Sequence, residues 1–396
     1  MSKMFNKILI MLDNSDYSTW ALDSTLDIAD QFGSNLTGAH VYAARLHETR
    51  FVQMEPGLPA EFQDPVKLQE QRDIHSELIE HGLHIISDSY LDVFRDRCSQ
   101  RGISHDSKSM EGRNYSELVR DIRNVKYDLV AMGAKGLGEV KTSQLGSVCE
   151  RVTRRVQVDT LVIKRPLKLK NGHVVVGIDG SEQSFAAMHS AIQMSKRLDC
   201  KITALTVFDP DFHSKVFNSI SSVLSKEASD TFKFEQQEQL HDQIIDSGLE
   251  KIYRDHLEKA KLLAEEAGVQ IESFVLAGKA YDEILKWLNG KDIALLILGK
   301  IGVHGGNELD IGSNAENLLR NANCNVMLVS RRSKPKDVLH DQGEIEWSNE
   351  AIELLERVPG FVRNMVRGHM ESQARITRAS IITADMMKEA RKQMGM

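Results

Sequence analysis

The apolar run Ile8-Leu9-Ile10-Met11-Leu12, followed by Asp13, decides the fold, because it returns 166 residues later as Val174-Val175-Val176-Gly177-Ile178, followed by Asp179. A repeat of this length indicates a duplicated domain rather than a solenoid of short units. Further pairs recur at the same offset: Val41 and Val207, Gly112 and Gly278, Gly133 and Gly299, Gly146 and Gly312, and Ser147 and Ser313.

Both repeats alternate apolar runs with helical patterns. A helical pattern follows the first run at 20–29 and 186–192, and a second run follows it at 36–41 and 202–207. Runs rich in Val and Ile are typical of strands buried on both faces of a parallel sheet. Alternating strands and helices therefore predict an α/β fold with two tandem, doubly wound parallel sheets. The later predicted strands are 127–132 and 160–163 in the first repeat, and 293–298 and 326–329 in the second.

Composition narrows the function classes. The chain has 396 residues, of which 41% are hydrophobic and 27% charged, and its net charge of −7 argues against bulk nucleic-acid binding. No stretch approaches the roughly 18 apolar residues of a membrane span, so a membrane partner is not expected. Four cysteines without metal-ligand spacing indicate reduced, buried thiols in a cytoplasmic protein. They are Cys98, Cys149, Cys200 and Cys324.

Three domains are predicted: 1–166, 172–331 and a small all-α module at 347–396. Each repeat also carries a long segment after its second strand, at 43–88 and 209–254. Because loops of this length are usually functional or disordered, we interpret each segment as an insertion with its own helix, acting as a lid or an interface. In the tail, Ser348 or Asn349 is predicted to cap one helix and Thr383 another, with a helix around 361–366 between them.

A glycine signature follows the predicted strand at 127–132 and, in the second repeat, the one at 293–298. It reads Gly133-Ala134-Lys135-Gly136, nine residues, Gly146-Ser147, and again Gly299-Lys300-Ile301-Gly302, nine residues, Gly312-Ser313. Glycines let backbone amides approach a ligand closely, and the unpaired N–H groups at a helix start favour phosphate. The serine hydroxyls would cap the helix or donate to a phosphate oxygen. Lys135 and Lys300 stand at non-equivalent positions, so either could reach a phosphate or be solvated.

Asp13 and Asp179 end the first strand of each repeat, where an open α/β sheet forms its ligand crevice. A carboxylate there could accept a ribose hydroxyl or help to hold a hydrated Mg²⁺. The alternative is that each aspartate only caps the next helix. The joint recurrence of the aspartate and the spaced glycines favours binding.

Both halves resemble the universal stress protein family, whose ATP-binding members carry G-x2-G-x9-G-[ST]; the resemblance covers about 4–166 and 172–331. It implies that Asp13 and Asp179 contact ribose or metal, and that the backbones of Val41 and Val207 meet adenine. It also implies that the phosphates lie against the signature residues. These are Gly133, Gly136, Gly146, Ser147 and Val148 in the first repeat, and Gly299, Gly302, Gly312, Ser313 and Asn314 in the second.

The chain departs from the family pattern at a few positions. Asn14 stands where the second repeat keeps Gly180, which is a modest change because Asn tolerates left-handed backbone. Asn314 is less typical after Gly-Ser than Val148. Asp159 and Asn325 occupy the place before the last strand where the family often has Pro.

The tail resembles the small C-terminal domain of the light-independent protochlorophyllide reductase B subunit. Trp347, Val358-Pro359, Phe361-Val362-Arg363 and Ile382-Thr383 carry this resemblance. It implies a portable helical module that packs near a tetrapyrrole or a redox partner. The alternative is a basic, solvated helical face.

The sequence contains no strong signature of catalytic or metal-ligating residues. Glu238-Gln239-Leu240-His241 has the Glu-x-x-His spacing of di-iron sites, but Arg72 replaces the glutamate in the first repeat. The recurrence of His75 and His241 therefore favours a structural contact over a metal site. No Walker A motif and no Rossmann glycine motif follows the first strand. We predict no catalytic residue, and slow ATP hydrolysis at most.

The sequence thus predicts a tandem adenine-nucleotide-binding regulator in the stress response. It would bind ATP, with or without Mg²⁺, and signal its nucleotide state to an unidentified protein partner through the C-terminal module. The sequence leaves open whether the chain forms a homo-oligomer, and a nucleic-acid partner is not expected. Two alternatives remain: a non-catalytic scaffold with vestigial nucleotide sites, and a redox- or tetrapyrrole-linked accessory protein.

Overall fold

The computed structural model describes residues 4–140, 142–210, 246–303, 305, 310–334 and 346–356, and, beyond these, 358, 363, 366–367, 370–371, 374, 379 and 381–393. The chain divides into two compact units, Met1–Lys334 and Pro335–Met396. Both predicted repeats belong to the first unit, and the tail forms the second.

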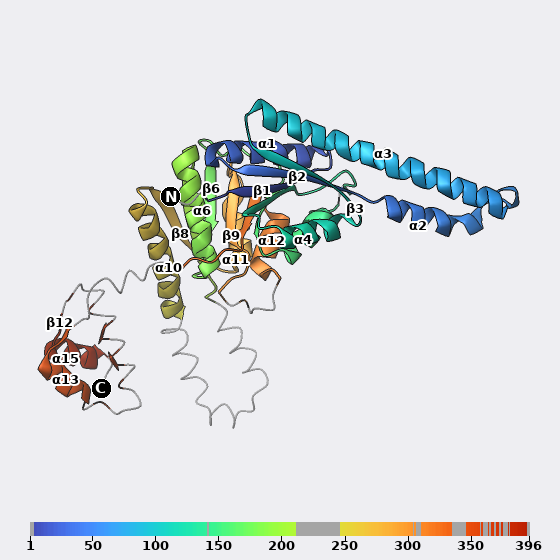
Figure 1. Ribbon diagram of the computed structural model, residues 1–396. Helices are drawn as coiled ribbons and strands as arrows, with labels where there is room; N and C mark the ends of the chain where they lie inside the picture. The colour runs from blue at the N-terminus through green and yellow to red at the C-terminus, as the bar shows by residue number, and fades with distance from the viewer. Residues whose placement is uncertain are drawn as a thin grey trace, which may run out of the picture. The chain divides into compact units, whose positions relative to one another are not determined.

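Outside the inserted segments, the two repeats share the same series of elements (Figure 1). The first contains β1 (Lys7–Met11), α1 (Asp16–Phe32), β2 (Asn35–Tyr42), α2 (Ala44–Met54), two 3-10 turns (Glu55–Gly57 and Ala60–Phe62), α3 (Pro65–Gln100), β3 (His105–Glu111), α4 (Asn114–Asn124), β4 (Leu129–Gly133), α5 (Ser147–Arg155) and β5 (Asp159–Ile163). The second contains β6 (His173–Gly177), α6 (Glu182–Leu198), β7 (Lys201–Phe208), α10 (Asp246–Glu266), β8 (Ile271–Ala277), α11 (Ala280–Leu288), β9 (Leu295–Gly299), α12 (Ser313–Asn321) and β10 (Asn325–Val329).

Strands β1 to β10 form one continuous sheet, in the order β3-β2-β1-β4-β5-β10-β9-β6-β7-β8. Pairing within each repeat is parallel, which confirms the predicted doubly wound α/β fold. The repeats join where β5 and β10 pair antiparallel, with Val162 opposite Val326. The two predicted sheets are therefore halves of one mixed sheet. Because both strands are fully buried, pairing removes two apolar edges that would otherwise invite aggregation.

Helices cover both faces of the sheet. One hydrophobic cluster packs β-strand residues against α1, α3, α6 and α10. The other packs the opposite face against α4, α5, α11 and α12. Both clusters contain residues from the two repeats, so the core is shared across the duplication.

The third strand of each repeat, β3 and β8, is absent from our sequence predictions. β3 reads HDSKSME, which contains no apolar run. These strands form the two ends of the sheet, where one side of each is unpaired and partly exposed. β3 therefore lacks the continuous apolar signature by which buried parallel strands are recognised, whereas β8 carries its apolar residues mainly at its end, Phe274 to Ala277.

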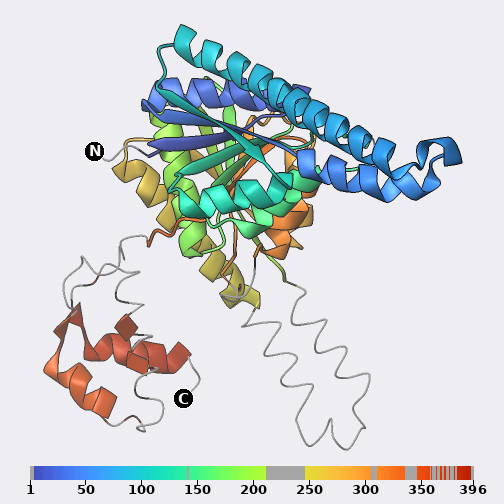
Figure 2. The same cartoon turned by 45° about the vertical axis from the view of Figure 1, so that its right-hand side comes forward.

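The inserted segment of the first repeat is a helical hairpin. Figure 2 shows α2 and the first half of α3 extending away from the sheet, while the second half of α3 packs on β2. Phe51 and His75 stack with ring centroids 4.2 Å apart, and Arg72 pairs with Glu55. His75 therefore makes a structural contact. The lid or interface role of the hairpin stays a prediction, and 211–245 of the second insertion, including Glu238 and His241, lies outside the described residues.

The second unit contains α13 (Asn349–Glu356) and α15 (Ala384–Gln393). The Ser348 hydroxyl accepts from the N–H of Ala351 at 3.2 Å, and that of Thr383 from Met386 at 3.4 Å, which confirms two predicted caps. The all-α prediction is wrong in one respect: β11 (Glu346–Trp347) pairs in parallel with β12 (Ile381–Ile382). These strands directly precede the two helices, so backbone pairing sets the helices side by side. Most of 361–366 lies outside the described residues.

The four cysteines are free and buried, as predicted, and burial raises the pKa of each thiol. Among the helices within the described ranges, none combines the length and apolarity needed to cross a bilayer.

Candidate functional site

A crevice opens at the same place in each repeat. The strand order turns back at the first strand, since β1 lies between β2 and β4, and β6 lies between β7 and β9. In open α/β sheets, this switch point is where ligands bind, outside the carboxyl ends of the strands. The first repeat has a cavity of about 540 Å³ here, and the second has one of about 250 Å³.

The predicted site residues gather around these two cavities. The first is lined by Asp13, Val41, Gly133, Gly136, Gly146, Ser147 and Val148. The second is lined by Asp179, Val207, Gly299, Gly302, Gly312, Ser313 and Asn314. The structure thus brings together every predicted member of each set. Their contacts with a nucleotide stay a prediction.

Asp13 connects the first strand to the glycine loop. One carboxylate oxygen accepts from the N–H and hydroxyl of Ser15, at 3.1 and 2.6 Å, and the other accepts from the N–H of Leu137 at 3.3 Å. Ser15, rather than Asp13, caps α1, because its hydroxyl accepts from the N–H of Ser18. The capping alternative for the aspartate is therefore wrong.

The second repeat has the same arrangement. Asp179 accepts from the N–H and hydroxyl of Ser181, at 3.0 and 2.6 Å, and from the N–H of Val303 at 3.1 Å. Ser181 caps α6. Each aspartate thus fixes its glycine loop against the first strand while its carboxylate lines the cavity.

The glycines are required by close approaches within the protein. A Cβ on Gly133 would lie 2.7 Å from Cβ of Tyr17, and one on Gly136 would overlap the Asp13 carboxylate. In the second repeat, a Cβ on Gly302 would lie 2.7 Å from an oxygen of Asp179. These glycines therefore allow the loop to pack on α1 and on the aspartate. The sequence predicts that they clear space for a ligand, and the structure gives them this additional role.

The cavity faces a helix start that carries no capping side chain. Gly146 is the N-cap of α5, and its N–H donates to the carbonyl of Ala134 at 2.7 Å. Ser147 is the first helical residue, so its hydroxyl does not cap the helix. The first bond within the helix joins the N–H of Glu150 to Gly146. The N–H groups of Ser147, Val148 and Cys149 precede that bond, and all three residues line the cavity. Gly312 and Ser313 repeat this arrangement at α12.

The two lysines of the glycine loops behave differently. Lys135 lines the first cavity, where its amine pairs with Glu139 at 2.6 Å. Lys300 neither reaches the second cavity nor is solvated, contrary to both sequence alternatives. It is 0% exposed, and its amine donates to the carbonyl of Val156 at 2.6 Å. Burial lowers the pKa of Lys300 to about 8.

Sequence reasoning missed two residues on α10. Tyr253 lines the second cavity, and burial raises its pKa, with Asp179 adding to the shift. His256 packs against Gly180, and its buried Nδ1 has no hydrogen-bond partner among the described residues. The equivalent of Tyr253 is Ser87, which bonds His40 and Ser109 instead. Because these positions differ between the repeats, the recurrence that revealed the other site residues gave no signal here.

The turn after each aspartate and the distribution of metal-ligating side chains complete the description of the two sites. Asn14 has φ of +60° where Gly180 has +85°, so asparagine accommodates the left-handed turn as predicted. Among the described residues, no group of three or more His, Cys, Asp or Glu side chains could hold a metal ion.

Comparison with known proteins places these features in a family. The model of the universal stress protein family matches residues 4–164 and 170–330. The model of the proto-chlorophyllide reductase 57 kD subunit matches residues 347–391. A universal stress protein from Methanocaldococcus jannaschii is 28% identical over 161 residues, which cover 41% of this chain and 83% of that protein.

The tail and the fold have their own relatives. A light-independent protochlorophyllide reductase polypeptide of Pelodictyon phaeoclathratiforme, the B subunit of that enzyme, is 41% identical over 58 residues, covering 15% of this chain and 11% of that protein. The crystal structure of a universal stress protein from Archaeoglobus fulgidus has the same fold, with a TM-score of 0.52 and 14% identity, covering 83% of this chain and 99% of that chain.

Some universal stress protein structures hold adenine nucleotides. One is a complex with cAMP, at 22% identity and a TM-score of 0.28, covering 41% of this chain and 98% of that chain. Another, from Arabidopsis thaliana, has AMP bound, at 17% identity and a TM-score of 0.25, covering 40% of this chain and 92% of that chain.

Proposed function

The chain belongs to the universal stress protein family, and from that premise we propose that it is an ATP-binding regulator with two nucleotide sites. Each site would take one ATP, with or without Mg²⁺. The phosphates would lie against the start of α5 or α12, and adenine against the backbone of Val41 or Val207. The nucleotide state would pass through the C-terminal module to a protein partner in the cytoplasm.

One observation carries the proposal: in both repeats the cavity at the sheet's switch point faces a helix start without a capping side chain. Three consecutive N–H groups at the start of α5 belong to residues that line the cavity. Such groups, together with the positive end of the helix dipole, favour a phosphate group. The carboxylates of Asp13 and Asp179 line the same cavities, where they would accept from ribose hydroxyls or hold a hydrated Mg²⁺.

The second candidate is a scaffold with vestigial sites. It is favoured by the close approaches of Gly133 and Gly136 to Tyr17 and Asp13. Since these contacts require glycine with or without a ligand, intact glycines do not discriminate between the two functions. A Gly→Val change would also disturb the loop itself, so a different substitution is needed.

Ser147→Asp and Ser313→Asp separate the two candidates. An aspartate in the first helical turn stabilises the helix, by about 0.3–1 kcal/mol, but places a negative charge where the phosphates would bind. We expect each change to weaken ATP binding at its own site about tenfold or more, without loss of thermal stability. Isothermal titration calorimetry with ATP and Mg²⁺, after removal of carried-over nucleotide, measures the binding.

Ser147→Ala and Ser313→Ala are the matched controls, because they remove the hydroxyl without adding charge. Binding by the wild type that is equally strong in both Asp variants would reject phosphate recognition at the helix starts. A wild type that binds no ATP and carries none from expression would favour the scaffold.

A further inference from the structure

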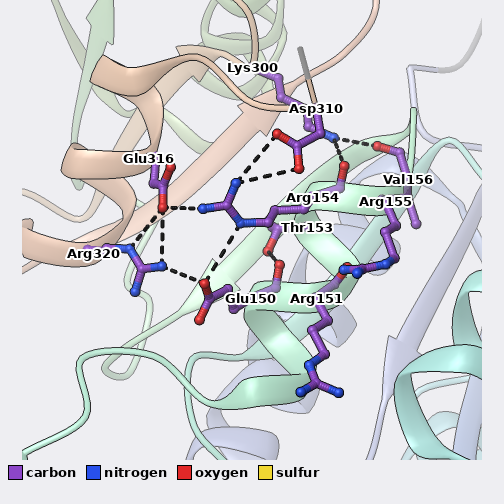
Figure 3. Close-up of polar contacts among 10 residues, drawn as sticks. All are labelled: Glu150, Arg151, Thr153, Arg154, Arg155, Val156, Lys300, Asp310, Glu316 and Arg320. Atoms are coloured by element: carbon purple, nitrogen blue, oxygen red, sulfur yellow. Dashed lines mark hydrogen bonds and ion pairs between the residues drawn. The ribbon is translucent and has the colours of Figure 1, made fainter. Parts of the chain in front are cut away.

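Helix α5 begins at the first cavity and ends against the second glycine signature. Its first residues, Ser147 and Val148, line the first cavity. Beyond its other end, the amine of Lys300 donates to the carbonyls of Val156 at 2.6 Å and Arg154 at 3.4 Å (Figure 3). Lys300 is the second residue of the signature Gly299-Lys300-Ile301-Gly302. One nine-residue helix therefore connects one candidate site to the loop of the other.

Arg154 makes a second connection from the same helix. Its guanidinium lies 3.4 Å from both carboxylate oxygens of Asp310, which stands two residues before Gly312 in the second glycine loop. The same guanidinium pairs with Glu316 on α12, and Arg320 of α12 bonds Glu150 of α5 at 2.5 Å (Figure 3). The last turn of α5 thus contacts both the loop and the helix that form the second site.

The pseudo-equivalent contacts at the end of α12 differ in one respect. Lys164 donates to the carbonyls of Ala322 at 2.6 Å and Arg320 at 3.4 Å, which repeats the pattern made by Lys300. However, Lys164 follows β5 and lies outside the first glycine signature. In the described part of the chain, a hydrogen bond of 2.9 Å between the exposed side chains of Gln144 and Asn321 links α12 to the first glycine loop. Of the two lysines, Lys300 alone belongs to a candidate nucleotide loop.

We propose that Lys300 and Arg154 are positioning residues that couple the two nucleotide sites through α5, so that ATP in the first site raises the affinity of the second. This inference rests on the proposed function. Phosphate at the start of α5 would fix the position of the helix, and with it the carbonyls at its end. The Lys300 amine must follow those carbonyls, because a buried donor without an acceptor is costly. The second loop is then held in its binding conformation, and the coupling is reciprocal.

The experiment measures the affinity of the second site with the first site intact or blocked by Ser147→Asp. Calorimetric titration of the full chain with ATP and Mg²⁺ supplies both values. In the wild-type background we expect the block to weaken the second site about threefold to tenfold, which is within the usual range of coupling between sites. In the Lys300→Met background we expect the block to change it less than about twofold. Arg154→Ala provides a second background that leaves Lys300 buried.

Lys164→Met is the matched control, because it removes the equivalent buried amine from α12 without touching a glycine signature. We expect it to lower stability much as Lys300→Met does and to keep the full effect of the block. Loss of the effect in Lys164→Met as well would reduce Lys300 to a stabilising contact and overturn the proposal. So would a wild-type second site that is indifferent to the block, and either result would leave ATP binding at both sites intact. Absence of ATP binding in the wild type would instead reject the proposed function, and the coupling with it.

Discussion

At the scale of single residues, two of the departures from the family pattern join the two repeats. Asp159 and Asn325, which replace the frequent Pro, are both 0% exposed. One oxygen of Asp159 accepts from the N–H of Ser330 at 2.9 Å, and that of Asn325 accepts from the N–H of Lys164 at 2.8 Å. Each side chain therefore fixes the segment that leaves the last strand of the other repeat. The sequence showed that these positions were unusual, but only the pairing of β5 with β10 explains why.

The two buried lysines give stability a distinctive pH dependence. Burial lowers the pKa of Lys164 and of Lys300 to about 8, well below the usual value of an exposed lysine. Between about pH 8 and 10.5 the unfolded chain binds more protons than the folded one, so stability rises with pH in this window. Below pH 8 both states are protonated, and the cost of burying the charge is constant.

We therefore expect the wild type to gain stability relative to Lys300→Met as the pH rises from 7.5 to 9.5. For one fully buried lysine the relative gain is on the order of 2 kcal/mol. Urea unfolding of both proteins at a series of pH values measures it. A difference between the two proteins that stays constant across this range would contradict the shifted pKa.

At the scale of elements, the long helix α3 depends on one glycine of β2. A Cβ on Gly38 would lie 2.6 Å from the ring of Phe94, which is fully buried between α3 and the sheet. Since the ring has no room to move, Gly38→Ala forces the helix away from the strand. We expect a loss of about 1–3 kcal/mol in the free energy of unfolding, measured by urea denaturation.

Gly82 on the same helix is the matched control for Gly38. A Cβ there would meet nothing within 4 Å, and the residue lies in the helix interior. Gly82→Ala should therefore stabilise the protein by up to about 1 kcal/mol, because alanine favours the helix. Equal effects of the two substitutions would mean that the packing of Phe94 on Gly38 is unimportant.

The sequence predicted the buried strands of the repeats and two capped helices of the tail, but not the edge strands. β1 and β6 each contain a continuous apolar run, which is visible in the local sequence. β3 has no such run, and it becomes a strand because β2 supplies its backbone hydrogen-bond partners. The tail shows the same limit, since β11 and β12 are two residues long and exist only as a pair.

At the scale of the whole molecule, the duplication forms one sheet with a shared core. We therefore expect the two repeats to open as one cooperative unit, although the sequence predicts each repeat as a separate domain. In native-state hydrogen exchange, the most protected amides of β4 and β9 should then report the same free energy of opening.

Asp159→Ala tests this cooperativity. It removes the acceptor of Ser330 and the partner of Arg331 at the junction between the repeats. We expect it to lower protection in both repeats equally, by about 1–3 kcal/mol. Asp292→Ala is the control, because its ion pair with Arg165 is exposed and is worth less than about 1 kcal/mol. A loss of protection confined to one repeat would show that the halves open independently.

The sequence by itself determined the repeat, the α/β fold of each half, and the aspartate, valine and glycine-signature residues that line each cavity, but not Tyr253. It could do so because buried parallel strands and helix starts have recognisable local sequence patterns, and because the duplication repeats those patterns at a fixed offset. Only the tertiary structure decided that Asp13 faces the glycine loop, that Ser15 rather than Asp13 caps α1, and that Lys300 reaches the opposite repeat. These outcomes depend on contacts between residues more than 100 positions apart or on the direction of a side chain, which no local pattern records.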